Sequence, residues 1–458
     1  MRSPLPLVPF ESYMLADDRA SHPMTFTIRL KFRGQIDQEA FRQSVFEALE
    51  RHPLLSARIV KRRFGRLAWD WSLSPEPYVD IADAQAPLRY PGGEAIDLRH
   101  GCGVRIWVRQ GAERCEMRLQ FHHACSDGIG AYRFIEDLLC AYHNRMVNAD
   151  QRVNLRPLNA TLLHNRARFG MGRLGMLARL PLELWGLVIG FATFFLRRPV
   201  KVYRPHRFQP VDPGAVVDQP AQVLSDEELA NLKRTSRREG ATLNDVLTRD
   251  LCLAIEQWNA KYGAAQRFKP IRVMVPVNLR TRGDDAMPAA NVVAMVFVDR
   301  KPAWYASSQW LLKTIAWELG LIKRFRLALA FVRGTALVRL IPGGLKFLTR
   351  ANRCYATCVF SNMGKVLNDT PLPYLDEKLS AGDLTLEAVE SASPVRPHTS
   401  VAFSCVTYGG RTRLVLNYER YALSASAAAA LFRTILAQVG VGASSPEPAT
   451  PVLVPTAA

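Results

Sequence analysis

The sequence of 458 residues predicts an α/β protein built from two lobes that are joined by a crossover segment. Two observations carry this prediction. Stretches with the period-two alternation of strands take turns with stretches of helical spacing, first over residues 1–160 and again over residues 221–441. Between them, residues 161–220 are basic and apolar, and their end is irregular and rich in proline. Residues 442–458 are rich in Ala, Pro and Ser and are expected to form a flexible tail.

In the first lobe, strand and helix patterns follow one another. The first strand has the apolar and polar alternation of a half-buried strand, and Gly34 ends this pattern. The helices have apolar side chains that recur three and four residues apart. The expected elements are a strand at 25–32, a helix at 36–50, strands at 104–108 and 116–122, and a helix at 129–143. This order is typical of an α/β lobe.

The second lobe is predicted to begin with two capped helices. Ser225 is followed three residues later by Glu228, which is the spacing of a capping box. Thr242 is expected to open the next helix in the same way. The remaining expected elements are strands at 271–276, 292–298, 355–360, 400–408 and 412–418, and a last helix at 424–439.

The positive charge is concentrated in two segments. Residues 164–207 and residues 309–353 each contain nine Lys or Arg and a single acidic residue, so they hold most of the net charge of +19. In both segments the basic residues alternate with long apolar runs, which suits an anionic lipid surface and does not suit a nucleic acid. Residues 180–196 contain Glu183 and are short for a spanning helix, so we expect an interfacial helix. The alternative is that both segments pack into the body of the protein with solvated Arg heads.

Composition and cysteine spacing bound the class of protein. Apolar residues at 48% and charged residues at 22% are ordinary globular values, which excludes an intrinsically disordered or collagen-like chain. The eight cysteines form no CxxC pair and no metal-ligand spacing, so no metal site is expected. The first ten residues lack the apolar core of a secretion signal. We therefore expect a reduced cytoplasmic protein, peripheral at the inner face of the membrane.

The chemistry is expected at the end of the strand over residues 116–122. His123 shares the inward face of this strand with Met117, Leu119 and Phe121, whereas His122 points to the other face. A tight turn with Gly128 follows, where the chain can approach another backbone or a thin ligand closely. A buried imidazole beside a ligand channel is the arrangement of a general base. The alternative is a histidine that is simply satisfied within the core.

These residues spell His-His-x-x-x-Asp-Gly over positions 122–128, and the chain resembles the coenzyme A-dependent acyltransferase superfamily. That superfamily includes chloramphenicol acetyltransferase, peptide-synthetase condensation domains and the wax ester synthase/diacylglycerol acyltransferases. The resemblance extends to residues 9–26 and to residues 37–59, which contain RHPLL. It continues with Asn244 and Asp245, VPVNLR at residues 275–280, Asn291 and FSN at residues 360–362. Where the wax ester synthase branch has Pro-Gly-Pro, this chain has Met-Gly-Lys at residues 363–365.

The resemblance implies two chloramphenicol acetyltransferase-like lobes with an active-site tunnel between them. It implies that His123 is the general base, while His122 belongs to the same catalytic motif and is interpreted chiefly as orienting the turn. It implies that Asp127 is structural and pairs with an arginine, for which Arg280 and Arg58 are both candidates. The candidate substrate-binding residues are Gly128, Asn244, Asp245, Ser361 and Asn362. No metal or resident cofactor is implied, because an acyl-CoA or acyl-carrier thioester serves as co-substrate.

For two of the candidate substrate-binding residues, the sequence also allows a simpler interpretation. Asn244 and Asp245 fit the first turn of an exposed helix, where Asp interacts favourably with the helix dipole. Cys125 lies inside the motif, but a nucleophilic role is not needed because His123 already accounts for transfer.

Three functions remain open from the sequence. The first is an acyltransferase of lipid metabolism that moves a fatty acyl group from acyl-CoA to a hydroxyl of a lipophilic acceptor. The second is a condensation-type enzyme that takes the acyl group from a carrier protein and forms an amide or ester with an alcohol or amine. The third is a non-catalytic member of the fold that binds lipid or a partner protein.

Overall fold

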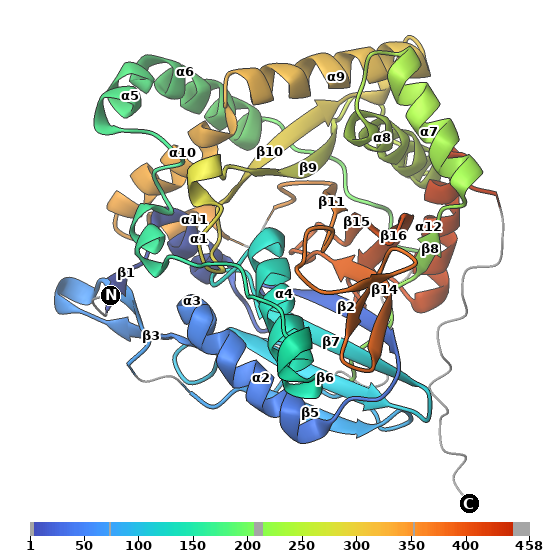
Figure 1. The fold of residues 1–458 in the computed structure, drawn as a ribbon. Helices are drawn as coiled ribbons and strands as arrows, with labels where there is room; N and C mark the ends of the chain where they lie inside the picture. The colour runs from blue at the N-terminus through green and yellow to red at the C-terminus, as the bar shows by residue number, and fades with distance from the viewer. Residues whose placement is uncertain (1–3, 73–74, 206–213, 351–352, 443–458) are drawn as a thin grey trace, which may run out of the picture.

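The computed structural model describes residues 4–72, 75–205, 214–350 and 353–442. Two large sheets, each covered by helices, form two lobes, which confirms the predicted α/β class (Figure 1). The first sheet has the order β12-β13-β14-β2-β7-β6-β5, and the second has the order β10-β9-β11-β15-β16-β8. A small third sheet, β1-β4-β3, lies beside the first lobe.

The first lobe contains every element that the sequence predicted for it. Alternate side chains of β2 are buried, from Phe26 to Phe32, because one face of this strand packs against the core. Phe121 of β7 meets Phe134 of α4 edge to face, with ring centroids 5.9 Å apart, so the helix that follows the motif covers its strand. The elements of this lobe are β1 (Leu5–Pro6), α1 (Pro9–Asp17), β2 (Thr25–Arg33), α2 (Gln38–Arg51), α3 (Pro53–Ser56), β3 (Arg58–Lys61), β4 (Leu67–Asp70), β5 (Tyr78–Asp83), β6 (Val104–Gln110), β7 (Arg114–His122) and α4 (Gly128–Met146).

The second lobe also begins as predicted. The Ser225 side chain accepts a hydrogen bond from the backbone N–H of Glu228, and the Glu228 carboxylate accepts one from the backbone N–H of Ser225. This capping box satisfies two N–H groups at the start of α7. The elements are β8 (Ala221–Val223), α7 (Asp226–Arg238), α8 (Leu243–Lys261), β9 (Ile271–Asn278), β10 (Val293–Arg300), α9 (Ser308–Arg324), α10 (Ala328–Leu340), α11 (Gly344–Leu348), β11 (Cys358–Lys365), β15 (Val401–Tyr408), β16 (Arg411–Tyr418) and α12 (Ala425–Val439).

Three strands from the second half of the chain belong to the first sheet. They are β12 (Tyr374–Leu375), β13 (Lys378–Ala381) and β14 (Leu384–Ala392). β14 pairs antiparallel with β2, and Glu390 lies opposite Arg29 in this register. The sequence assigned residues 221–441 to the second lobe, but this part of the range completes the sheet of the first lobe. The two lobes are therefore interlocked by the chain as well as packed together.

The crossover segment forms a helical layer on the outside of the molecule. α5 (Arg173–Ala178) and α6 (Leu180–Phe191) are followed by one turn of π-helix, η4 (Ala192–Leu196). α6 packs on α10 (Figure 1). In the described parts of the chain, no helix combines the length and apolar character needed to cross a membrane. Apart from Gly442, the predicted tail at residues 442–458 lies outside the described residues.

Candidate active site

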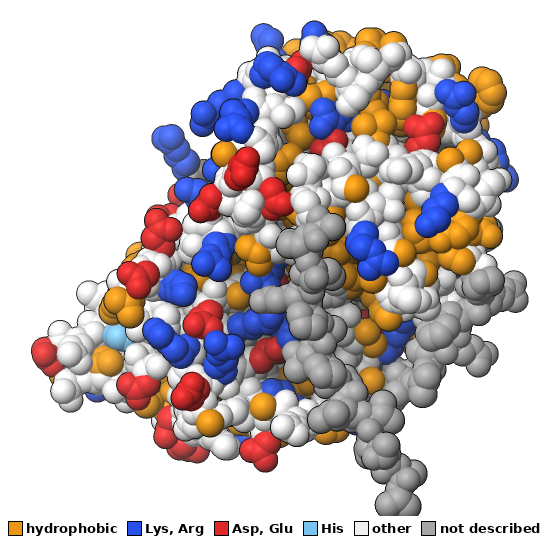
Figure 2. All heavy atoms as spheres, turned by 90° about the vertical axis from the view of Figure 1, so that its right-hand side faces the viewer, with side chains coloured by type: hydrophobic (Ala, Val, Ile, Leu, Met, Phe, Trp, Pro, Cys, Tyr) orange, Lys and Arg blue, Asp and Glu red, His pale blue; other side chains and the backbone are white. Residues whose placement is uncertain are grey.

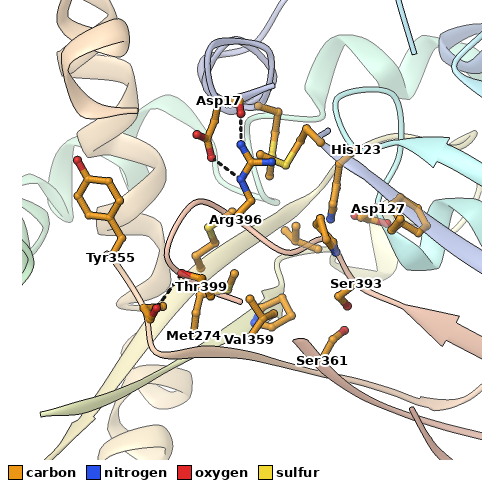
Figure 3. Close-up of a pocket in the computed structure, with 18 of the residues that line it drawn as sticks. Asp17, His123, Asp127, Met274, Tyr355, Val359, Ser361, Ser393, Arg396 and Thr399 are labelled. Carbon is orange, nitrogen blue, oxygen red and sulfur yellow. Dashed lines mark hydrogen bonds and ion pairs between the residues drawn. The ribbon is translucent and has the colours of Figure 1, made fainter. Parts of the chain in front are cut away.

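His123 lies immediately after β7 and lines a mostly apolar cavity (Figure 3). Its backbone N–H donates to the Met24 carbonyl at 2.8 Å, so the end of β7 stays anchored beside β2. Its imidazole lies against the Phe26 ring, with centroids 5.0 Å apart. Strand position and packing together aim the His123 side chain into the cavity, as the alternation along residues 116–123 predicts.

The cavity lies between the two lobes and holds about 180 Å³. One wall comes from α1 and β2, the second from β9 and β10, and the third from β11 and the loop after β14. Large apolar side chains form much of its surface, namely Tyr13, Met14, Met24, Phe26, Phe194, Met274, Met295, Phe297 and Met363. Unbranched methionine side chains adapt their shape to a flexible apolar chain.

Burial favours the neutral form of the His123 imidazole. Desolvation lowers the pKa of His123, and this effect outweighs the negative charge of Asp127 and the nearby carbonyls of His123 and Ser126, which favour the protonated ring. The Asn291 side-chain N–H donates to the His123 carbonyl at 2.6 Å, and the Asn291 nitrogen lies 3.2 Å from His123 Nδ1. Asn291 therefore fixes both the backbone and the ring of His123 from the second lobe.

Asp127 joins the two lobes through a buried ion pair with Arg280. The Arg280 guanidinium lies 2.6 Å from Asp127 Oδ2, and the same guanidinium donates to the Ala290 carbonyl at 2.8 Å. Val292 N–H donates to Asp127 Oδ2 at 2.8 Å, and Gly130 N–H donates to Oδ1 at 2.9 Å, which caps α4. Of the two arginines that the sequence left open, Arg280 is therefore the partner.

The contacts of the Asp127 carboxylate favour its ionised form, and both of its oxygens accept hydrogen bonds. Burial alone would raise its pKa, but the charge and hydrogen bond of Arg280 and the two backbone N–H groups lower the pKa of Asp127 below its usual value. Arg58, the other candidate, lies on β3 in the small third sheet, where its backbone pairs with Asp70. Asp127 thus has the structural position that the family resemblance implies.

His122 lies on the opposite side of the strand and is fully buried. Its Nδ1 accepts a hydrogen bond from Ala124 N–H at 3.0 Å, and its Nε2 lies 3.4 Å from Asp18 Oδ2. Asp18 also accepts a hydrogen bond from Met24 N–H at 2.7 Å. The sequence places His122 in the catalytic motif, but these contacts shape the turn, and His122 is not among the described residues that line the cavity.

Gly128 lies against the end of the Met363 side chain, which a larger residue at this position would have to displace. A Cβ at Gly128 would lie 2.5 Å from the terminal methyl of Met363. Ser361, Asn362 and Met363 of β11 all line the cavity together with Gly128. The end of the Met363 side chain therefore packs closely on Gly128 in the cavity wall.

The structure separates the two pairs of candidate substrate-binding residues on the second lobe. Ser361 and Asn362 line the cavity, but Asn244 and Asp245 are not among the described lining residues. The Asn362 side-chain N–H donates to Asn244 Oδ1 at 2.5 Å, so Asn244 holds Asn362 in place. Asp245 accepts from the Thr242 N–H at 2.7 Å and from its hydroxyl at 2.8 Å, so it caps α8.

Arg396 and Asp17 form a polar pair in the cavity wall that the sequence did not predict. Arg396 donates to the Asp17 carboxylate at 3.0 Å and to the His22 carbonyl at 2.5 Å, and both Arg396 and Asp17 line the cavity (Figure 3). Burial raises the pKa of Asp17, and the charge of Arg396 opposes this shift. Arg396 lies in a loop without periodicity, and its only signal is the pair of prolines, Pro394 and Pro397, on either side of it.

Cys125 does not have the environment of a nucleophile. Its side chain is fully buried, and burial raises the pKa of the Cys125 thiol well above its usual value. This agrees with the interpretation from the sequence.

Comparisons with known proteins identify the fold. No family model and no curated protein matches the sequence. Among solved structures, the first condensation domain of the CDA synthetase aligns over 95% of both chains with a TM-score of 0.67 and 14% identity. The chain has the condensation-domain fold. The starter condensation domain of rhizomide synthetase, solved as a mutant with C8-CoA and Leu-SNAC, covers 96% of this chain, which spans 94% of that domain, with a TM-score of 0.65 and 11% identity.

The epimerization domain of tyrocidine synthetase B has the same fold, with a TM-score of 0.63 and 13% identity over 96% of both chains. In the condensation-domain fold, two sheet-rich lobes meet as they do here, and this is the architecture that the sequence resemblance implied. The cavity that His123 lines lies where the two lobes meet.

Proposed function

We propose that this protein is an acyltransferase that moves an acyl group from a thioester to a hydroxyl of a lipophilic acceptor. The observation that carries the proposal is the imidazole of His123, whose pKa is lowered by burial, at an apolar cavity between two lobes of the condensation-domain fold. A neutral imidazole can accept a proton, and an apolar cavity strengthens the electrostatic interactions of the reacting groups.

In the proposed reaction, His123 takes the proton of the acceptor hydroxyl as its oxygen attacks the thioester carbonyl carbon. The C–S bond of the resulting tetrahedral intermediate then breaks, and the sulfur leaves as a thiolate that receives the proton from the imidazolium. The products are an ester and a free thiol, and His123 returns to its neutral state. The thioester provides the activation, so the step is written without a metal or a resident cofactor.

The other residues of the site would position His123 and the substrates. Asn291 holds the His123 loop, His122 and Asp18 shape the turn, and the Asp127–Arg280 ion pair joins the lobes on either side of the cavity. Ser361 and Asn362 supply polar groups on β11, which lines the cavity together with Gly128.

A fatty acyl group is the donor that fits the cavity wall. The lining is dominated by Met, Phe and other apolar side chains, which bury an aliphatic chain favourably. The starter condensation domain with the same fold was solved with C8-CoA, which is the kind of donor proposed here. We therefore propose an acyl-CoA as the donor.

A second candidate uses the same chemistry with a carrier-protein thioester and an amine. It is favoured by the likeness to condensation domains of peptide synthetases and by the Leu-SNAC bound to one of them. The two candidates differ in the donor that the protein accepts and in the bond of the product. As all eight cysteines are free thiols, we place the protein in the reducing cytoplasm in either case.

The deciding experiment incubates the purified protein with a panel of acyl-CoAs and acyl-carrier proteins, each with a lipid extract and an amine mixture. Products are identified by mass spectrometry. Esters that form from acyl-CoA and disappear with His123→Ala support the first candidate, and amides that form only from carrier proteins support the second. A protein that binds acyl-CoA or lipid but forms neither product with any donor would be a non-catalytic member of the fold.

A further inference from the structure

Helix α6 exposes large apolar side chains and buries its one charged residue. The one buried side chain among its described residues is the carboxylate of Glu183, which is 4% exposed. Trp185, Val188 and Phe191 are 62%, 69% and 64% exposed. A surface helix normally turns its apolar stripe inward and its charges outward. The outer side of α6 is therefore built to meet something less polar than water.

The inner side of α6 is fixed to α10. Gly186 lies against Ala330 and Gly334 lies against Leu187, so the two helices approach closely at small residues. Glu183 lies 3.1 Å from the Arg333 guanidinium on α10. This packing holds α6 with its apolar outer side exposed, so the exposure is a property of the folded protein.

Exposed apolar side chains continue from α6 onto its neighbours. Nine of the twenty-two large hydrophobic side chains that are exposed in the described chain lie between Leu174 and Leu196, and seven more lie between Trp310 and Phe347. We define the outer helical face as the exposed apolar side chains of α5, α6, α10 and α11, together with Ile341, which directly follows α10. They are Leu174, Leu177, Leu180, Leu184, Trp185, Val188, Ile189, Phe191, Leu337, Leu340, Ile341 and Phe347. Single exposed hydrophobic residues are common, but so many on helices that contact one another indicate a binding surface.

The exposed charged residues beside the outer helical face are basic. Glu183 is the only acidic residue of α5, α6, α10 and α11, and it is buried under α6. Arg197, Arg198 and Lys346, which border the apolar side chains, are exposed. Elsewhere the charges are mixed: on the face in Figure 2, acidic and basic side chains intermingle over the lower half. A bare apolar surface bordered by cations complements an anionic bilayer, whose interface attracts Lys and Arg and whose acyl region accepts Trp, Phe and Leu.

The outer helical face leads directly to the cavity of His123. Phe194 of η4 lines the cavity and stacks on Tyr355, with ring centroids 4.8 Å apart. Thr349 and Arg350, which follow α11, line the same cavity. The two chain segments that carry the apolar face therefore also form one end of the cavity.

We propose that the outer helical face docks on the surface of an anionic lipid bilayer, so that this end of the cavity opens at the membrane. A lipophilic molecule could then pass from the bilayer to His123 without crossing water. A second copy of the chain is disfavoured as the occupant, because a two-fold interface would bring the cations of one copy against those of the other. The docking itself does not depend on the proposed acyl transfer and is tested by binding alone.

The test is co-sedimentation of the full chain with vesicles of phosphatidylcholine alone and of phosphatidylcholine with phosphatidylglycerol, at low and high salt. We expect binding to the anionic vesicles and release by salt. Trp185→Ser with Val188→Ser removes two apolar side chains from the face and should weaken binding at least roughly tenfold. Arg197→Gln with Arg198→Gln should weaken it by roughly fivefold for each arginine.

Matched controls use exposed residues outside the face. Phe268→Ser removes an apolar side chain that is 80% exposed, and Arg62→Gln with Arg63→Gln removes two exposed charges beside β3. Both control variants should bind vesicles as the wild type does. The proposal is overturned if vesicle binding has no preference for anionic lipid, or if the face variants and the control variants bind equally well. It is also overturned if the wild type is a dimer that the Trp185→Ser with Val188→Ser variant converts to a monomer without any vesicle binding.

Discussion

Asp127 and Glu183 are both buried carboxylates paired with arginine, but their surroundings differ. Asp127 is 1% exposed and has an ion pair at 2.6 Å, two backbone N–H donors and a partner, Arg280, that is itself buried. Glu183 has ion pairs at 3.1 Å with Arg333 and 3.8 Å with Arg179, and these arginine side chains are 35% and 26% exposed. Its Oε1 has no hydrogen-bond partner among the described groups.

The carboxylate at the junction of the two lobes thus has more partners than the carboxylate between α6 and α10. A buried charge is costly to remove from water, and only a full set of partners offsets that cost. Asp127 has such a set, so the lobe junction behind His123 is rigid. Glu183 has an incomplete set, so we expect its ion pairs to contribute less to the free energy of unfolding than the ion pair of Asp127.

Replacing His123 tests whether the chemistry can be removed without disturbing this junction. His123→Ala should lower kcat for acyl transfer by roughly 10²–10⁴-fold, because a general base contributes about that factor. The melting temperature should stay close to that of the wild type, since the Asp127 contacts do not involve the imidazole. As a matched control, His122→Ala should cause a smaller loss, since its contacts only shape the turn. An equal loss of activity in the two variants would assign them equal roles.

Removing Asp127 should cause the largest loss of stability. Asp127→Ala leaves Arg280 buried without its counter-ion, and we expect the free energy of unfolding to fall by about 3–5 kcal/mol. Urea denaturation of Asp127→Ala, Arg280→Ala and the double variant measures this loss and the coupling between the two residues. Additive losses would show that the two side chains do not act as a pair.

Glu183→Gln should have a smaller effect. It replaces a carboxylate whose partners are partly exposed, so water can solvate Arg179 and Arg333 once the charge is gone. We expect a loss of about 1.5–3 kcal/mol, the range for hydrogen bonds to charged groups. The same urea titration measures it, with Arg62→Gln as a surface control. A loss as large as that of Asp127→Ala would remove the distinction between the two sites.

The pH dependence of activity gives the smallest and most specific effect. Because burial lowers the pKa of His123, the imidazole stays neutral at neutral pH, and kcat/KM should fall only as the pH drops through that lowered pKa. Asp127 raises the pKa of His123 against this trend, so Asp127→Asn should move the acidic limb of the pH profile to lower pH. A shift to higher pH would contradict the placement of Asp127 next to the ring.

Most of the fold could be predicted from local patterns, and part of the site could not. The strand at 25–32 and the helix at 129–143 have clear periodicity, and both are present as β2 and α4. β14 was missed because Glu387 and Glu390 interrupt its apolar character, and its partner β2 lies far away in the sequence.

The sequence could not choose between Arg280 and Arg58, because Arg280 follows a strand and Arg58 belongs to one. Only the packing of the two lobes brings Arg280 to Asp127. The pair of Asp17 and Arg396 was missed for the same reason. The two residues come from α1 and from a loop near the other end of the chain, and no local pattern joins them.

The pairing of β14 with β2 makes the folding of the first lobe depend on residues that are synthesised much later. Residues Arg29 and Glu390, which face each other across this pair, are 361 positions apart. At about 5–20 residues per second, the edge of β2 stays open on the ribosome for tens of seconds before β14 can cover it. An open strand edge is a site of misassociation, so the nascent first lobe needs protection during that interval. For the same reason, residues 1–160 expressed alone should aggregate, and the two lobes cannot be exchanged between proteins as independent modules.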